Sequence, residues 1–139
     1  MKRTLFLCAA AALAFGAGLA TPSIVSAQQQ AVSAKTLMDE PLVGGTYEQM
    51  LMQEVSLAPN ANVAWHIHPD GHEITYVMEG EVTLKRDGEA DHVFKAGEGL
   101  HLNANVPHAA QAGASGAKLL IVRTKPKDKP VAQPVQRTN

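Results

Sequence analysis

Hydrophobic and polar residues alternate along most of the chain after its first few dozen positions. The alternation comes in short segments separated by Gly, Pro, Asn and Asp, which break or reverse an extended chain. These segments are residues 46–57, 62–68, 73–80, 81–88, 91–97, 99–111 and 117–124. In a strand, successive side chains point to opposite faces, so the pattern is that of half-buried strands. It predicts an all-β domain, a sandwich or barrel, with no helix longer than a turn or two.

Two sharp reversals are expected inside this region. Asp87 and Gly88 separate "VTL" from "HVF" and are residue types that accept positive φ, which predicts a tight hairpin. Gly80, in "MEGEV", predicts a second reversal of the chain.

The beginning of the chain differs from the rest. Met1-Lys2-Arg3 is a short basic start, an apolar run rich in Ala and Leu follows, and "VSA" precedes Gln28. Together these features predict a secretory signal peptide over residues 1–27 and an exported bacterial protein, periplasmic or secreted. A membrane anchor is the alternative, but the apolar run is short for a span and no charged stop-transfer cluster follows it.

The remaining chain is predicted to be one domain, because two would each be too small to bury a sound core. Residues 28–45 form an N-terminal segment that is either loose or contributes an edge strand around Lys35 to Met38. The barrel itself is expected over residues 46–124. Residues 125–139 are basic and proline-rich, and we predict a flexible tail there, with a binding arm as the less favoured alternative.

Composition limits the chemistry that is open to the domain. The single cysteine, Cys8, lies in the signal peptide, so the exported domain has no disulfide and any metal ligands must be nitrogen or oxygen. Without Lys2 and Arg3, 10 basic residues stand against 13 acidic ones, a formal charge of −3. We find no basic stripe interleaved with aromatic residues, so nucleic acid is not an expected partner.

Histidines gather in the stretch "WHIHPDGHEITYVMEGE". His66 and His68 are two residues apart, so in a strand their imidazoles project from the same face. A turn at residues 69–71 brings Glu73 back in front of them on the next strand, and His108 in "NANVPHAA" offers a non-local ligand. Two histidines, a returning carboxylate and a distant histidine predict a site for a transition metal.

Two stretches resemble the motifs of a known family. Residues 66–80, "HIHPDGHEITYVMEG", resemble the first cupin motif, which is His-x-His, three or four residues, Glu, six residues and Gly. Residues 95–110, "KAGEGLHLNANVPHAA", resemble the second, which leads through a strand and a turn to one histidine. The sequence is thus similar to small single-domain cupins from about Gln53 to Val122. It departs from the second motif at Asn103, where proline is usual, and at His101, where an aromatic or aliphatic residue is common.

The resemblance implies a fold and a ligand set. Cupins are jelly-roll barrels, also described as a double-stranded β-helix, with two facing antiparallel sheets and a metal bound inside. Carried over to this sequence, the metal ligands are His66, His68, Glu73 and His108. The ion would be one divalent transition metal, Fe, Mn, Ni, Cu, Co or Zn. Four protein ligands leave positions open for a small molecule.

The function implied is a metal-dependent enzyme, a dioxygenase, isomerase or lyase acting on a small oxygenated molecule. Glu73 and His101 are then the candidate catalytic bases. The alternatives are a non-catalytic protein that binds a metal or small ligand, and a barrel whose ligand set holds no metal. His72 is expected to point away from the site, whereas His101 could face either the pocket or solvent.

The expected partner is a small-molecule ligand or substrate, with no membrane contact once the signal peptide is removed. The resemblance also implies a homodimer formed through sheet edges, to which the segment from Thr36 to Met38 could contribute.

Overall fold

A computed structural model describes residues 31–45 and 47–137, so the predicted signal peptide lies outside the described residues. Every element is a β-strand, which confirms the all-β prediction. The strands are β1 (Val32–Pro41), β2 (Gln49–Leu57), β3 (Asn62–Ile67), β4 (His72–Arg86), β5 (His92–Lys95), β6 (Gly99–Leu102), β7 (His108–Lys125) and β8 (Gln133–Pro134). Within the described ranges, no helix has the length and apolar character needed to cross a membrane.

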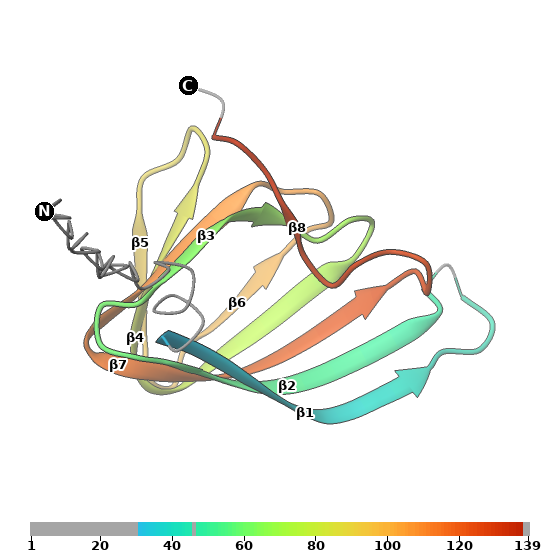
Figure 1. The fold of residues 1–139 in the computed structure, drawn as a ribbon, viewed down its shortest axis with the longest axis horizontal. Coiled ribbons are helices and arrows are strands. Elements are labelled where there is room, and N and C mark those ends of the chain that lie inside the picture. Colours follow the sequence, from blue (N-terminus) through green and yellow to red (C-terminus); the bar gives the residue numbers. More distant parts are fainter. Residues whose placement is uncertain (1–30, 46, 138–139) are drawn as a thin grey trace, which may run out of the picture.

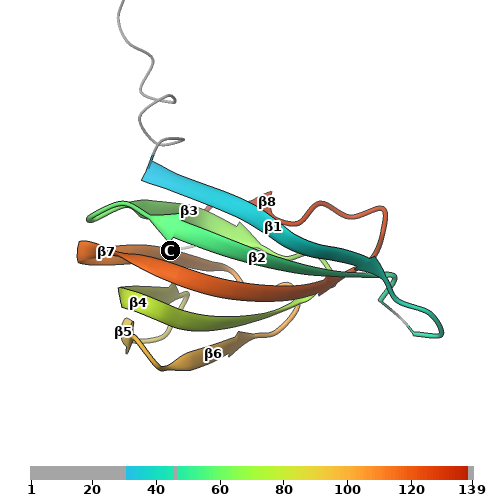
Figure 2. The same cartoon turned by 90° about the horizontal axis from the view of Figure 1, so that it is seen from below.

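Two long strands, β4 and β7, pair on both sides of an interruption near Gly80 and belong to both sheets of the barrel (Figure 1). The later part of β7 and the earlier part of β4 lie in a sheet with the order β1-β2-β7-β4-β6, seen from top to bottom in Figure 2. The other halves of the same strands lie in a sheet with the order β8-β3-β7-β4-β5. The result is the jelly-roll arrangement predicted from the sequence.

Glycines permit the bend that carries β4 and β7 from one sheet to the other. Gly80 and Gly116 have φ angles of 73° and 79°, which side-chain-bearing residues rarely adopt. A Cβ on Gly80 would lie 2.1 Å from the carbonyl oxygen of Gly116, so the two backbones can approach only without side chains. The predicted reversal at Gly80 is therefore wrong, because β4 continues through this residue and changes partners instead of turning back.

The hairpin predicted at Asp87 and Gly88 is confirmed. Strands β4 and β5 pair antiparallel, with Leu84 opposite His92. Gly88 has a φ of 72°, as a tight turn requires.

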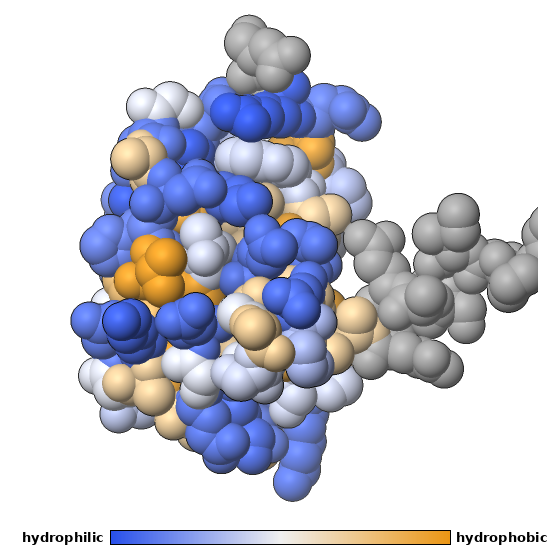
Figure 3. Space-filling model, turned by 90° about the vertical axis from the view of Figure 1, so that its left-hand side faces the viewer, coloured by the Kyte–Doolittle hydropathy of each residue, from blue (hydrophilic) through white to orange (hydrophobic). Residues whose placement is uncertain are grey.

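The apolar core lies between the two sheets. It is made of inward-facing residues from several strands, mainly Val55, Leu57, Val77, Val82, Leu119 and Ile121. Burying a side chain of this size contributes about 1.5–3 kcal/mol. The outer face seen in Figure 3 is mainly hydrophilic, with only small separate hydrophobic areas.

The N-terminal segment does contribute an edge strand. β1 extends beyond the predicted Lys35 to Met38 and pairs only with β2, with an irregularity between Thr36 and Met38. Most of its side chains are exposed.

The C-terminal segment, predicted to be a flexible tail, contains a short strand. β7 itself runs to Lys125, and the chain then crosses back to form β8 beside β3, with Gln133 opposite Ile67 (Figure 1). Proline does not prevent this pairing, because β8 is an edge strand and the missing N–H of Pro134 can face outward.

Candidate metal centre

Strand register brings the predicted histidines together. His66 near the end of β3 is paired directly with His108 at the start of β7, although the two are far apart in sequence. His68 follows β3 by one residue, so it stays close to both. The ring centroid of His66 lies 5.0 Å from that of His68 and 4.2 Å from that of His108. The site therefore combines one local pair with one cross-strand partner.

The two turns that carry His68 and His108 are tied to each other. Asp70 and Asn105 form reciprocal bonds: the Asp70 N–H donates to Asn105 Oδ1 at 3.1 Å, and Asn105 Nδ2 donates to Asp70 Oδ1 at 3.0 Å. The Asn105 N–H also donates to the carbonyl oxygen of His68 at 3.1 Å. Both residues have positive φ, which Asp and Asn tolerate better than most side chains. This clamp fixes the spacing between the two turns.

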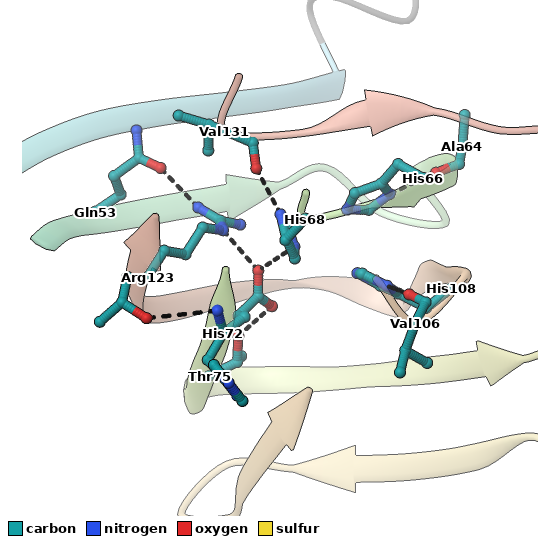
Figure 4. Close-up of polar contacts among 12 residues, drawn as sticks. Gln53, Ala64, His66, His68, His72, Thr75, Val106, His108, Arg123 and Val131 are labelled. Atoms are coloured by element: carbon teal, nitrogen blue, oxygen red, sulfur yellow. Dashed lines mark hydrogen bonds and ion pairs between the residues drawn. The ribbon is translucent and has the colours of Figure 1, made fainter. Parts of the chain in front are cut away.

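The three histidines form one group that could hold a metal ion. One ring nitrogen from each of His66, His68 and His108 lies within 4.8 Å of the others. His68 and His108 are buried and His66 is half-buried. Figure 4 shows how the three side chains lie. Imidazole nitrogen is a common ligand for zinc, copper, iron and nickel.

Backbone carbonyls orient all three rings. The Nδ1–H of His66 donates to the carbonyl of Ala64 at 2.8 Å, and that of His108 donates to Val106 at 2.8 Å. His68 donates from Nδ1 to the carbonyl of Val131 at 2.6 Å. A carbonyl can only accept, so each Nδ1 carries the proton. In a neutral ring this leaves Nε2 with a lone pair for a metal.

Burial keeps two of these rings uncharged. Desolvation lowers the pKa of His66, and it lowers that of His108 to about 4. Neighbouring histidines lower both pKa values further, whereas the backbone bonds and Glu73 oppose the shift. At neutral pH both rings are therefore neutral, which is the form that binds metal.

Glu73 lies beside His68 and is not part of the three-histidine group. Its Oε2 is 2.8 Å from His68 Nε2 and accepts from Arg123 Nε at 2.7 Å, while its Oε1 accepts from the Thr75 hydroxyl at 2.8 Å. Burial by itself would raise the pKa of Glu73, but His68 and Arg123 outweigh it and hold the pKa well below its usual range. A carboxylate held so firmly ionised is a weak base. In this arrangement Glu73 is better suited to face a cation than to take a proton.

The contact between His68 and Glu73 is the best test of whether the site fits a metal. With the proton on Nδ1, a neutral His68 presents a lone pair to the carboxylate, so two acceptors meet at 2.8 Å. No described residue gives the buried His68 Nε2 a well-oriented hydrogen bond. A cation shared by both groups would satisfy the two acceptors. Two ligand atoms about 2.1 Å from one ion are about 3 Å apart at right angles, so the donor set fits a metal.

His101 lies outside the cavity, which corrects its assignment as a candidate base. Its neighbours Leu100 and Leu102 both line the cavity, whereas His101 is exposed on the opposite face of β6. There it stacks on His72 with ring centroids 5.3 Å apart, and His72 Nδ1 lies 3.1 Å from His101 Nε2. His72 thus points away from the site, as expected.

A cavity of about 220 Å³ adjoins the histidines. Its wall is largely apolar, with side chains such as Val55, Leu84 and Leu119, and its polar groups include His66, His108, Glu73 and Arg123. The volume lies below the 300–1,000 Å³ of pockets for drug-sized ligands, so the cavity suits a smaller molecule.

Two contributors to the site were missed by the sequence reasoning. Arg123 donates to Glu73 and, through Nη1, to Gln53 Oε1 at 2.7 Å. A signal for it existed, because Arg123 continues the inward alternation of Leu119 and Ile121, where a charge is unusual. The carbonyl of Val131 had no such signal, since a backbone group carries no sequence information.

Comparisons with known proteins agree with this fold. Residues 53–123 match the cupin domain family. KdgF from a Halomonas species superimposes with a TM-score of 0.61 at 17% identity, covering 72% of this chain and 84% of that one. A cupin-like protein from Thermotoga maritima superimposes with a TM-score of 0.61 at 22% sequence identity, covering 78% of both chains. A chain from the crystal structures of two DMSP lyases, RdDddP and RnDddQII, superimposes with a TM-score of 0.61 at 16% sequence identity. The match covers 76% of this chain and 53% of the other. At such identities the likeness shows the fold alone. None of the curated proteins matched.

Proposed function

The chain belongs to the cupin family, and on this basis we propose that it is an exported, metal-dependent enzyme acting on a small oxygenated molecule. One observation carries the proposal. Three histidines are locked by their Nδ1–H bonds so that their remaining nitrogens are available to one ion at the wall of a cavity. A protein that only stores or senses the ion would need the ligands but not the adjoining cavity.

His66, His68 and His108 would hold the ion, with Glu73 as the fourth ligand. A bound divalent metal supplies Lewis acidity to an oxygen of the substrate, and some of these ions also support oxygen chemistry. The fixed ring orientations mean that little rearrangement is needed when the ion enters.

Arg123 supports an oxygenated, electron-rich ligand. Its guanidinium lines the cavity and its side chain is 12% exposed, so its positive charge acts in a setting poorly screened by water. Nε and Nη1 are held by Glu73 and Gln53, which fixes the plane of the guanidinium. A carboxylate, an enolate or a phenolate oxygen is the kind of group that this charge would stabilise.

The apolar remainder of the wall excludes water from the reacting groups. Leu84, Leu100 and Leu119 supply part of this surface. Dioxygenase, isomerase and lyase reactions all remain within the proposal, and the name of the structural neighbour described under DMSP lyases supports the last of these.

Metal content tests the proposal first. The protein is purified from an exporting host without affinity metal or chelator, and its metals are measured by mass spectrometry beside His66→Ala and His108→Ala. His92→Ala is the matched control, because His92 is exposed on β5. We expect about one transition ion per chain in the wild type and the control, and loss of that ion in both site variants.

Turnover then separates an enzyme from a binding protein. The metal-loaded protein is screened against small carboxylates, enediols and phenols, with the two site variants as blanks. Conversion that depends on His66 and His108 supports the enzyme. A wild type that takes up none of the candidate ions would refute metal dependence, and stoichiometric binding without conversion would favour the non-catalytic alternative.

A further inference from the structure

We propose that the C-terminal segment 126–137, defined here as the strap, is an integral part of the metal centre, and that the carbonyl of Val131 is the positioning group for His68. The inference rests on the proposed metal-binding function. It adds that one ligand of the ion depends on a distant piece of chain that docks on the barrel (Figure 4).

The three histidines differ in how their rings are held. His66 and His108 each donate to a carbonyl two residues earlier, so the strand that carries the ring also orients it. His68 donates to Val131, 63 residues away in sequence, at 2.6 Å. If the strap detaches from the barrel, His66 and His108 keep their hydrogen-bond partners. His68 loses the carbonyl of Val131.

Several contacts hold the strap in place. The Val135 N–H donates to the carbonyl of Trp65 at 3.1 Å, which continues the β8–β3 pairing into the strap's later part. The guanidinium of Arg137 lies 5.6 Å from the Trp65 ring, within the range of a cation–π contact. At the other end, Lys125 Nζ donates to the carbonyls of Pro126 and Lys127 at 2.8 and 3.3 Å. The strap is therefore anchored on both sides of Val131.

The strap also helps to enclose the cavity. Ala132 lines it together with Val32 and Ala34 of β1. Its prolines at positions 126, 130 and 134 restrict the free chain, which reduces the conformational entropy lost on docking. A segment that looks disordered by composition is thus stiff enough to dock through a few hydrogen bonds.

The tautomer of His68 is a direct readout that does not require metal. Two-dimensional ¹H–¹⁵N spectra of the imidazole rings are recorded on chelator-treated, ¹⁵N-labelled protein. One variant ends after Lys129, which removes Val131 and β8, and the matched control ends after Gln136, which keeps both. We expect the truncation to change the His68 ring signals and leave those of His66 and His108 at their Nδ1–H positions. Because the control keeps β8 and the Val135 bond and loses only the outermost contact, that of Arg137 with Trp65, its His68 signals should stay close to those of the full chain.

Zinc affinity, measured by competition with a chromophoric chelator, gives the second readout. We expect the dissociation constant of the chain ending after Lys129 to rise about 10–100-fold, as found when a partner of a metal-bound histidine is lost. The full-length Val135→Pro variant removes the N–H that binds Trp65 and should shift both readouts in the same direction by less. If the truncated chain does not fold, the Val135→Pro variant alone provides the two readouts.

The outcomes distinguish the strap from the proposed function. Unchanged His68 signals and unchanged zinc affinity in a folded variant would overturn the positioning role. If the His68 signals change but the full chain binds neither zinc nor any other of the candidate ions, the metal proposal fails and the positioning of His68 by Val131 stands.

Discussion

Arg123 and Glu73 illustrate how much one residue can depend on another inside the barrel. Glu73 is buried and ionised. The desolvation free energy of an isolated buried carboxylate exceeds the net stability of a folded domain. The guanidinium of Arg123, 2.7 Å from Oε2, makes this burial tolerable. Breaking the pair is costly, because the loss of one partner leaves the other charge buried and uncompensated.

Arg123→Leu should therefore destabilise the protein by about 3–5 kcal/mol, measured by urea unfolding of chelator-treated protein. Arg86→Leu is the matched control, because Arg86 forms an exposed ion pair with Glu89. Its loss should cost at most about 1 kcal/mol. Equal costs for the two variants would contradict a structural role for the buried pair.

Acidification should destabilise the chelator-treated protein. Desolvation lowers the pKa of His108 from 6.5 to about 4, so between these values the unfolded chain binds a proton that the folded chain does not. The contribution of His108 to the free energy of unfolding is therefore complete above about pH 6.5. It falls by about 3 kcal/mol as the pH drops to 4. Glu73, whose pKa is also lowered, adds a further loss at lower pH. Urea midpoints across this range test the slope, and His108→Gln should make it shallower. A midpoint that rises on acidification would refute the prediction.

At the scale of elements, the bends in β4 and β7 decide the architecture. Each strand serves both sheets, so the barrel closes only if both strands can change direction and resume their pairing beyond the bend. Gly80 and Gly116 meet these demands because they accept positive φ and let two backbones approach. Any side chain at either position would push apart the backbones that approach each other there.

Gly80→Ala should cost about 3–5 kcal/mol or prevent folding, because its Cβ would sit 2.1 Å from the Gly116 carbonyl oxygen. Gly88→Ala measures the cost of the positive φ without the steric clash, since Gly88 has a similar φ of 72° but open space around it. The control should cost about 1–2 kcal/mol. Thermal and urea unfolding would compare them, and a similar loss in both would mean that the close approach is unimportant.

At the scale of the whole molecule, the exposed edge of β1 has backbone groups that another strand could bind. The homodimer inferred from the family resemblance stays a prediction. Light scattering should give twice the mass of one chain, and Leu37→Glu should weaken the association, because Leu37 is exposed at the irregular part of β1. A single-chain mass at all concentrations would contradict it.

The local features of this protein were predictable from its sequence. The hairpin at Gly88 and the pairing of His66 with His68 on one face follow from interactions within a few residues. The approach of His108 was expected from the family resemblance, and the register of β3 and β7 now accounts for it. These predictions held because turn chemistry and strand periodicity act over short distances.

Other features depended on register and on distant chain. His101 faces outward because it pairs with Ile74, and a slip of one residue would have turned it inward. Gly80 was compatible with either a reversal or a bend, since both use positive φ, and only the partner strand decided between them. The docking of Val131 on His68 depends on a backbone carbonyl, which every residue possesses. Local sequence signals thus specified most of the strands, the turn at Gly88 and the kind of chemistry. Which groups meet followed from the fold alone, because contacts between distant segments depend on how the sheets align.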